Sequence, residues 1–186
     1  MVRPVLDADE TRRLLGWMER AIAEPEDGEP LHLYALLDGA RDERVAPMVR
    51  GFGARQRCLF DGDLHPALAA AAPYIVALDP DAAATRALLA AAWGSAWGVF
   101  VAAPVGLDAL RHHFRRFLRV ADEQGRQLVF RYYDPRVLRL YLPTCTEAEL
   151  ELVFGPVRGF LIEDEDPARG AQMRRGGGAL VAIPRA

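Results

Sequence analysis

The chain has 186 residues, of which 51% are hydrophobic and 26% are charged, and its formal net charge is −3. This length and composition suit one globular domain with a buried core, and they exclude a disordered chain. A weakly acidic chain has no overall attraction to nucleic acid or to an anionic membrane. All 23 basic residues are arginine, so no lysine can act as a Schiff base, a general base or a phosphate-loop cation.

Helices and strands alternate along the first half of the chain. Asp7 or Asp9 can cap a first helix, whose apolar residues Leu14, Leu15 and Met18 recur at helical spacing. Apolar runs bounded by turn residues then predict strands at 31–38, 55–60, 74–78 and 97–102. Helical segments are expected between these strands, at 45–52, 66–72 and 79–93.

The second half continues the pattern. A helix is predicted at 107–120, a turn at 122–125 and a strand at 126–133. Asp134 followed by Pro135 is a strong helix start, because aspartate caps a helix and proline suits its first position. Thr146 and Glu149 form a capping-box pattern ahead of a helix that ends near residue 154. A last strand is expected at 158–164.

This alternation predicts an α/β fold with a single mixed or largely parallel sheet flanked by helices, and with a possible small helical C-terminal lobe. Residues 1–166 are assigned to one α/β domain, within which 143–166 are a possible semi-independent lobe. Residues 167–186 are a Gly- and Arg-rich tail that could add one edge strand at 179–184. The uncharged stretch 87–107 is interrupted by glycine and proline, so it is interpreted as helix, turn and buried strand rather than a membrane span.

Charge is unevenly distributed in the C-terminal half. Residues 104–144 hold eight arginines and four acidic residues, and 145–166 hold one arginine and seven acidic residues. The tail from 167 holds four arginines and no acidic residue. Such blocks either neutralise one another within the fold or present faces of opposite charge to different partners.

Three aspartates follow predicted strands: Asp38, Asp61 and Asp134. Gathered at one sheet edge, they could bind Mg²⁺ for hydrolysis of a phosphodiester or phosphate ester, with Arg136 stabilising negative charge. The alternative is turn and cap chemistry, because an aspartate side chain readily accepts hydrogen bonds from nearby backbone N–H groups.

Other catalytic patterns are missing from the sequence. His112 and His113 are adjacent, so they cannot chelate a metal as a helical i, i+4 pair, and no metal site is expected. Ser95 is not in a G-x-S-x-G elbow. Cys58 and Cys145 are expected to be reduced thiols. The charged N-terminal segment lacks the apolar core of a signal peptide, so a cytoplasmic location is expected.

Several segments, taken in order, resemble a known family: "LYALLDGA", "RCLFDGDL", "APYIVALDP", "WGVFVAAPVGLDALRHHFRRFLRV", "FRYYDPRVLRLYLP" and "FGPVRGFLIEDED". Together they are similar to the domain-of-unknown-function family of type VI secretion effector adaptors, also called effector chaperones or Tap/TEC proteins. The resemblance covers roughly 31–166, which is most of the chain.

The resemblance implies a cytoplasmic adaptor without enzymatic activity and without a cofactor. Such adaptors bind a toxic effector and load it onto a VgrG-type spike, sometimes through a PAAR tip protein; nucleic acid and membrane are not expected partners. Arginines on the surface of a helix favour acidic groups of a partner protein. The residues expected to bind partners are Arg131, Tyr133, Arg136, Arg139, Arg115 and Trp97.

Overall fold

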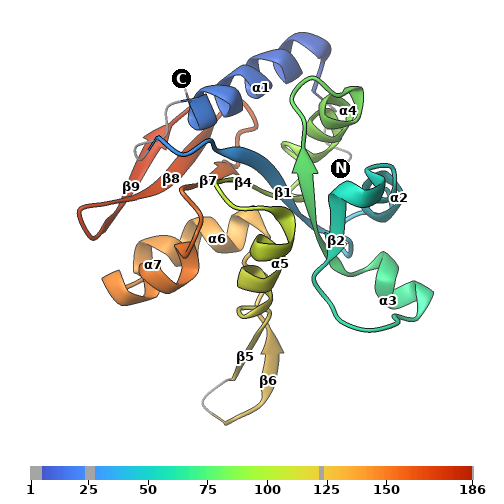
Figure 1. The fold of residues 1–186 in the computed structure, drawn as a ribbon, viewed down its shortest axis with the longest axis vertical. Helices are drawn as coiled ribbons and strands as arrows, with labels where there is room; N and C mark the ends of the chain where they lie inside the picture. Colours follow the sequence, from blue (N-terminus) through green and yellow to red (C-terminus); the bar gives the residue numbers. More distant parts are fainter. Residues whose placement is uncertain (1–5, 24–27, 122–123, 186) are drawn as a thin grey trace.

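The computed structural model describes residues 6–23, 28–121 and 124–185 (Figure 1). The predicted turn at 122–125 lies partly outside these residues. The helices are α1 (Ala8–Ala23), α2 (Val45–Arg50), α3 (Pro66–Ala70), α4 (Ala83–Ala92), α5 (Leu107–Arg115), α6 (Pro135–Tyr141) and α7 (Glu147–Phe154). The strands are β1 (His32–Asp38), β2 (Gln56–Cys58), β3 (Pro73–Leu78), β4 (Gly98–Ala103), β5 (Arg119–Ala121), β6 (Gln127–Val129), β7 (Gly159–Glu163), β8 (Gly170–Gly176) and β9 (Ala179–Pro184).

The main sheet has seven strands in the order β2-β3-β1-β4-β7-β8-β9. Each neighbouring pair in it is antiparallel. The prediction of a mixed or largely parallel sheet is therefore wrong. The reason lies in the strand order: β1 and β2 run in the same direction with β3 between them, and β3 and β4 do so with β1 between them. This is the split β-α-β arrangement, in which interleaved crossover units form an antiparallel sheet.

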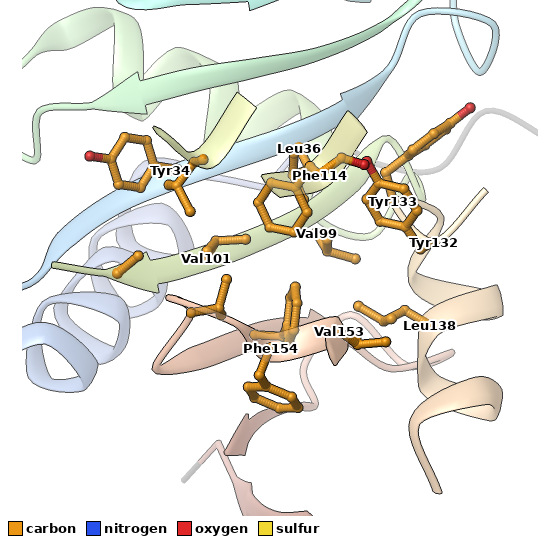
Figure 2. Close-up of a cluster of buried hydrophobic side chains, with 14 of the residues drawn as sticks. Tyr34, Leu36, Val99, Val101, Phe114, Tyr132, Tyr133, Leu138, Val153 and Phe154 are labelled. Atoms are coloured by element: carbon orange, nitrogen blue, oxygen red, sulfur yellow. The ribbon is translucent and has the colours of Figure 1, made fainter. Parts of the chain in front are cut away.

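Helices cover both faces of the sheet. Side chains of β1 alternate between the faces, because successive residues of a strand point in opposite directions. Leu33, Ala35 and Leu37 pack in one hydrophobic cluster with residues of α1, α2 and α4. Tyr34 and Leu36 belong to the opposite cluster, which contains residues of α5, α6 and α7 (Figure 2).

The segment assigned to a possible C-terminal lobe contributes to that second cluster. Phe154 at the end of α7 lies against Phe160 of β7, with ring centroids 5.1 Å apart. Phe160 in turn is close to Phe114 of α5. Residues of α6 and α7 are therefore packed on the same sheet as the N-terminal strands, and Figure 2 shows Leu138, Val153 and Phe154 in one cluster with β1 and β4 side chains.

Local capping signals in the sequence are confirmed. Asp7 accepts a hydrogen bond from the N–H of Glu10 at 2.8 Å, and Glu10 accepts one from the N–H of Asp7 at 3.0 Å. Thr146 and Glu149 make the same reciprocal pair at the start of α7. Each pair satisfies N–H groups that a helix leaves unbonded in its first turn.

The C-terminal tail extends the sheet by two strands. The edge strand expected near 179–184 is confirmed as β9, whereas β8 was not predicted. Gly177 and Gly178 join the two strands with φ values of +60° and +83°. Two successive positive φ values are typical of the two-residue hairpin turn that glycine allows at little steric cost.

The structure differs most from expectation in two neighbouring segments. These are the end of the helix predicted at 107–120 and the strand predicted at 126–133. Helix α5 ends at Arg115, and residues 119–121 and 127–129 form a separate antiparallel hairpin, β5–β6, that projects away from the body (Figure 1). All six strand residues of this hairpin are exposed. The part of the chain described by the structure holds no helix that is long and apolar enough to cross a membrane.

Candidate functional site

Buried carboxylates lie at the C-terminal ends of two inner strands of the sheet. Asp38 is the last residue of β1 and Glu163 the last of β7, and both side chains are buried. The two strands run in the same direction with β4 between them, so their C-terminal residues lie on the same side of the sheet, one strand apart. Asp134 is also buried, and its charge adds to burial, the largest cause, in raising the pKa of Asp38. We refer to Asp38, Asp134 and Glu163, with the arginines that contact them, as the polar region.

Glu163 holds the turn between α4 and β4. Its carboxylate accepts hydrogen bonds from the backbone N–H groups of Gly94 and Ala96, at 2.5 and 2.8 Å. Both residues have positive φ values, +81° and +55°. A left-handed conformation at alanine costs about 1–2 kcal/mol, so the two hydrogen bonds to a charged acceptor offset this strain.

Asp38 is held less completely. Its side chain accepts a hydrogen bond from the N–H of Ala40 at 3.0 Å and lies 3.5 Å from Nη1 of Arg131. Burial raises the pKa of Asp38, and the Ala40 N–H and the Arg131 charge offset only part of that effect. Arg131 is exposed, so it reaches this carboxylate from the surface.

Asp134 caps α6 and also binds Arg136. Its carboxylate accepts the backbone N–H of Arg136 at 2.9 Å and two side-chain hydrogen bonds from the same residue. Burial by itself would raise the pKa of Asp134, but the hydrogen bonds from Arg136 lower it below its usual value. The predicted cap is confirmed, and Arg136 is fixed against the surface in a defined orientation.

Arg139 is directed to a different set of acidic groups. It donates to the carbonyl of Glu163 at 3.0 Å and forms ion pairs with Asp164 at 3.3 Å and Glu165 at 3.6 Å. The basic and acidic sequence blocks thus neutralise each other in part within the fold. Because Arg139 already has these partners and its side chain is only 23% exposed, it offers a partner protein less than Arg136 and Arg131 do.

Two of the residues expected to contact partners are buried. Tyr133 and Trp97 are 3% and 1% exposed, so neither presents a side chain to a partner. Burial, followed by the charge of Asp38, raises the pKa of Tyr133 to about 12, and its hydroxyl stays protonated at neutral pH. Trp97 lies beneath Arg44, whose guanidinium carbon is 5.0 Å from the indole centroid. Both side chains therefore pack inside the fold, beneath residues that are exposed at the surface.

Arg115 lies in another region, against Asp61. Arg111 pairs with the same carboxylate at 3.2 Å and also donates to the carbonyl of Cys58 at 2.8 Å. Asp61 therefore ties α5 to the end of β2. Asp38, Asp61 and Asp134 do not form one site, and no group of three potential metal ligands occurs among residues 6–23, 28–121 and 124–185.

Exposed apolar side chains form a second surface that the sequence did not reveal. Val120 faces Leu128 across the β5–β6 hairpin. Phe130, which is half-buried, follows the last residue of β6, and its N–H donates to the carbonyl of Leu118, so the side-chain alternation of the hairpin continues to it. The ring of Phe130 contacts that of Tyr141 at a centroid distance of 4.8 Å. Leu140, 72% exposed, shares a shallow groove with Phe130. We refer to Val120, Leu128, Phe130 and Leu140 as the hydrophobic strip.

The hydrophobic strip borders the polar region directly. Its groove is also lined by Asp134 and Arg136. On the opposite side of the hairpin, Val129 lines a second groove with Leu64 and Leu68, beside Arg115 and Arg119. The surface around α6 and the hairpin therefore combines exposed apolar side chains with arginines.

The sequence profile of a domain of unknown function, DUF4123, matches residues 33–152. This match covers more than half of the chain. The chain belongs to the DUF4123 family. No curated protein and no solved structure matches it significantly. The DUF4123 match extends from β1 into α7, so it includes Asp38, Asp134 and the whole hydrophobic strip but not Glu163.

Proposed function

We propose that this DUF4123 protein is an adaptor that binds a type VI secretion effector in the cytoplasm and delivers it to a VgrG-type spike. Family membership supports the proposal, because the motifs of this chain resemble those of the effector adaptors described above. The function is conditional protein binding without chemistry. An adaptor must hold its cargo and then release it, which corresponds to roughly micromolar to nanomolar affinity.

The observation that carries the proposal is the hydrophobic strip. Leu140 and Leu128 are 72% and 47% exposed, and Val120 is 41% exposed. Grouped apolar side chains at a surface are favourable sites for a partner, since burial of apolar surface is the dominant favourable contribution to most protein association. The strip is also on a projecting hairpin and a short helix, where a partner protein can reach it without steric obstruction from the sheet.

The arginines beside the strip suit the rim of a protein interface. Arg136 is oriented by Asp134, so less side-chain entropy is lost when its outward N–H groups bind a partner's carboxylate. Arg131 reaches the same region from the loop before α6. An apolar centre with a polar, arginine-containing rim is the usual organisation of such interfaces. We infer that the effector presents apolar residues flanked by acidic ones.

Affinity capture tests the function. The tagged full-length protein is expressed in its native cells, under conditions in which the secretion system is produced, and co-purifying proteins are identified by mass spectrometry. The proposal predicts recovery of a toxin encoded near this protein's gene together with a spike protein. Recovery of neither would contradict it.

A further inference from the structure

A groove rich in arginine lies far from the hydrophobic strip, between α1 and the end of the chain. It has a volume of about 620 Å³. Helix α1 contributes Arg12, Arg13 and Arg20, and the C-terminal segment contributes Arg185. We refer to these four residues as the arginine groove. Figure 1 shows α1 alongside β8 and β9, which brings together two segments from opposite ends of the sequence.

The floor of the groove is open because of a glycine. Arg13, Gly16 and Arg20 follow one another at helical spacings of three and four, so they share one face of α1. Glycine within a helix costs about 1 kcal/mol relative to alanine. Packing does not account for this glycine, because a Cβ atom at position 16 would meet only Nη1 of Arg20, at 3.8 Å. The glycine leaves the floor between the two arginines without a side chain.

Arg185 is fixed by contacts with Trp93 and with the carbonyl of Pro167. Its guanidinium carbon lies 5.7 Å from the ring centroid of Trp93, and its Nη1 donates to the carbonyl of Pro167 at 3.4 Å. Trp93 donates to the same carbonyl at 2.8 Å. Burial, together with the charge of Arg13, lowers the pKa of Arg185, and the charge of Glu10 offsets only part of that effect. A partly buried cation is thus fixed beside another cation.

The groove has little internal compensation for this positive charge. Arg12 pairs with Asp9 at 2.6 Å, and Glu10, which also lines the groove, bonds the N–H of Asp7. Within the described ranges, no acidic side chain forms an ion pair with Arg13, Arg20 or Arg185. A negatively charged ligand would relieve the repulsion between Arg13 and Arg185.

We propose that the arginine groove binds an extended acidic peptide segment of a partner protein. Arg13 and Arg20 are separated by seven residues, or about 10 Å along the helix axis. In an extended peptide of the polyproline II type, which has three residues per turn, carboxylates three residues apart share one face and are separated by about 9 Å. The arginines are therefore spread along the groove at a spacing that suits successive acidic side chains, rather than converging on one phosphate. Leu6, Pro167 and Ala168 supply apolar contact for the methylene groups of the peptide.

This inference does not depend on the adaptor function, because it concerns a different surface. If the adaptor function holds as well, the groove and the hydrophobic strip are two separate binding surfaces on one chain. A protein that connects a cargo to a second component needs two such surfaces.

Fluorescence anisotropy with the full-length protein tests the groove. The probe is a short labelled peptide with glutamate at every third position and serine or glycine between, and the same peptide with glutamine in place of glutamate is the reference. At low ionic strength we expect saturable binding of the glutamate peptide and at least about tenfold weaker binding of the glutamine peptide, because each carboxylate–arginine pair is a charge-assisted interaction.

Two groove variants and one control variant locate the binding. Arg13→Glu with Arg20→Glu is expected to weaken binding at least about tenfold. Arg50→Glu with Arg86→Glu makes the same change in net charge outside the groove and should leave affinity unchanged. Gly16→Leu places a side chain on the floor without altering charge, and we expect weaker binding from a chain whose thermal stability is maintained or increased.

Three outcomes would overturn the proposal. One is absence of saturable binding of the glutamate peptide. Another is equal loss of affinity in the two double-arginine variants, which would show a non-specific charge effect. The third is tight binding of a single-stranded oligonucleotide that has the same charge as the peptide. If the oligonucleotide binds as tightly as the peptide and is weakened by the same variants, the groove is a phosphate site instead.

Discussion

Asp134 and Arg136 form a closed local unit: one carboxylate accepts the backbone N–H of Arg136 at 2.9 Å and its Nε and Nη2 at 2.9 and 2.5 Å. The same interaction starts α6 and orients a guanidinium on the surface. The segment Tyr-Tyr-Asp-Pro-Arg thus joins a structural role to an exposed cation, because the buried acid fixes the position of the arginine.

Replacement of Asp134 should separate these two roles. Asp134→Ala removes the helix cap and leaves Arg136 without its partner, and we expect a loss of about 1–3 kcal/mol in the free energy of unfolding. Asp134→Asn keeps an oxygen that can accept the N–H of Arg136, so its loss should be clearly smaller. Urea unfolding of the two variants measures the difference, and equal losses would argue against the capping role.

His113 should make stability depend on pH. Its ring is buried and lies 2.9 Å from the carbonyl of Val153, and burial lowers its pKa below the usual 6.5. Below pH 6.5 the unfolded chain binds a proton at this position while the folded chain does not, so stability falls as the pH decreases toward the folded pKa. The contribution is fully present above pH 6.5.

Urea unfolding between neutral and mildly acidic pH checks this expectation. His113→Gln keeps a donor for the Val153 carbonyl but does not titrate, so the pH dependence should become shallower. The adjacent His112 is exposed, and His112→Gln should retain the wild-type dependence. An unchanged slope in His113→Gln would contradict the assignment.

Gly155 should be less tolerant of substitution than Gly53. Both have positive φ, +48° and +55°, and a left-handed conformation strains alanine by about 1–2 kcal/mol. Gly155 also has a ψ of −113°, which lies outside the left-handed helical region, so the strain on alanine is larger there. At Gly155 a Cβ atom would also lie 2.5 Å from Cε1 of His113, whereas at Gly53 nothing lies within 4 Å. We expect Gly155→Ala to lose about 3 kcal/mol. Thermal unfolding compares the pair, and similar melting temperatures would disprove the close contact.

Local signals in the sequence predicted most helix starts and the positions of the main strands. Asp7, Asp134 and Thr146 cap helices as expected, because capping depends on residues within one turn. Strand pairing depends on contacts far apart in sequence, and helix–strand alternation is compatible with either a parallel sheet or a split β-α-β arrangement. The relative direction of neighbouring strands therefore could not be predicted from the order of helices and strands.

The candidate surfaces were only partly predictable, for a related reason. The apolar residues Leu128 and Val129 contributed to the prediction of a strand at 126–133, but the strand is short, belongs to a separate hairpin and leaves both side chains exposed. Tyr133 and Trp97 are typical interface residues by type, and yet the fold buries both. The arginine groove combines Arg13 with Arg185, and no local pattern connects residues so far apart.

The affinity between this protein and its captured effector tests the central claim most directly, measured by calorimetry on purified proteins. Leu128→Asp with Leu140→Asp changes one strand and one helix residue of the hydrophobic strip. Leu152→Asp with Val181→Asp changes two other exposed apolar residues, on α7 and β9, outside the strip. The adaptor account predicts that the first variant stays folded and binds the effector at least about tenfold more weakly, while the second binds as the wild type does. Equal affinity of the strip variant and the wild type would contradict it.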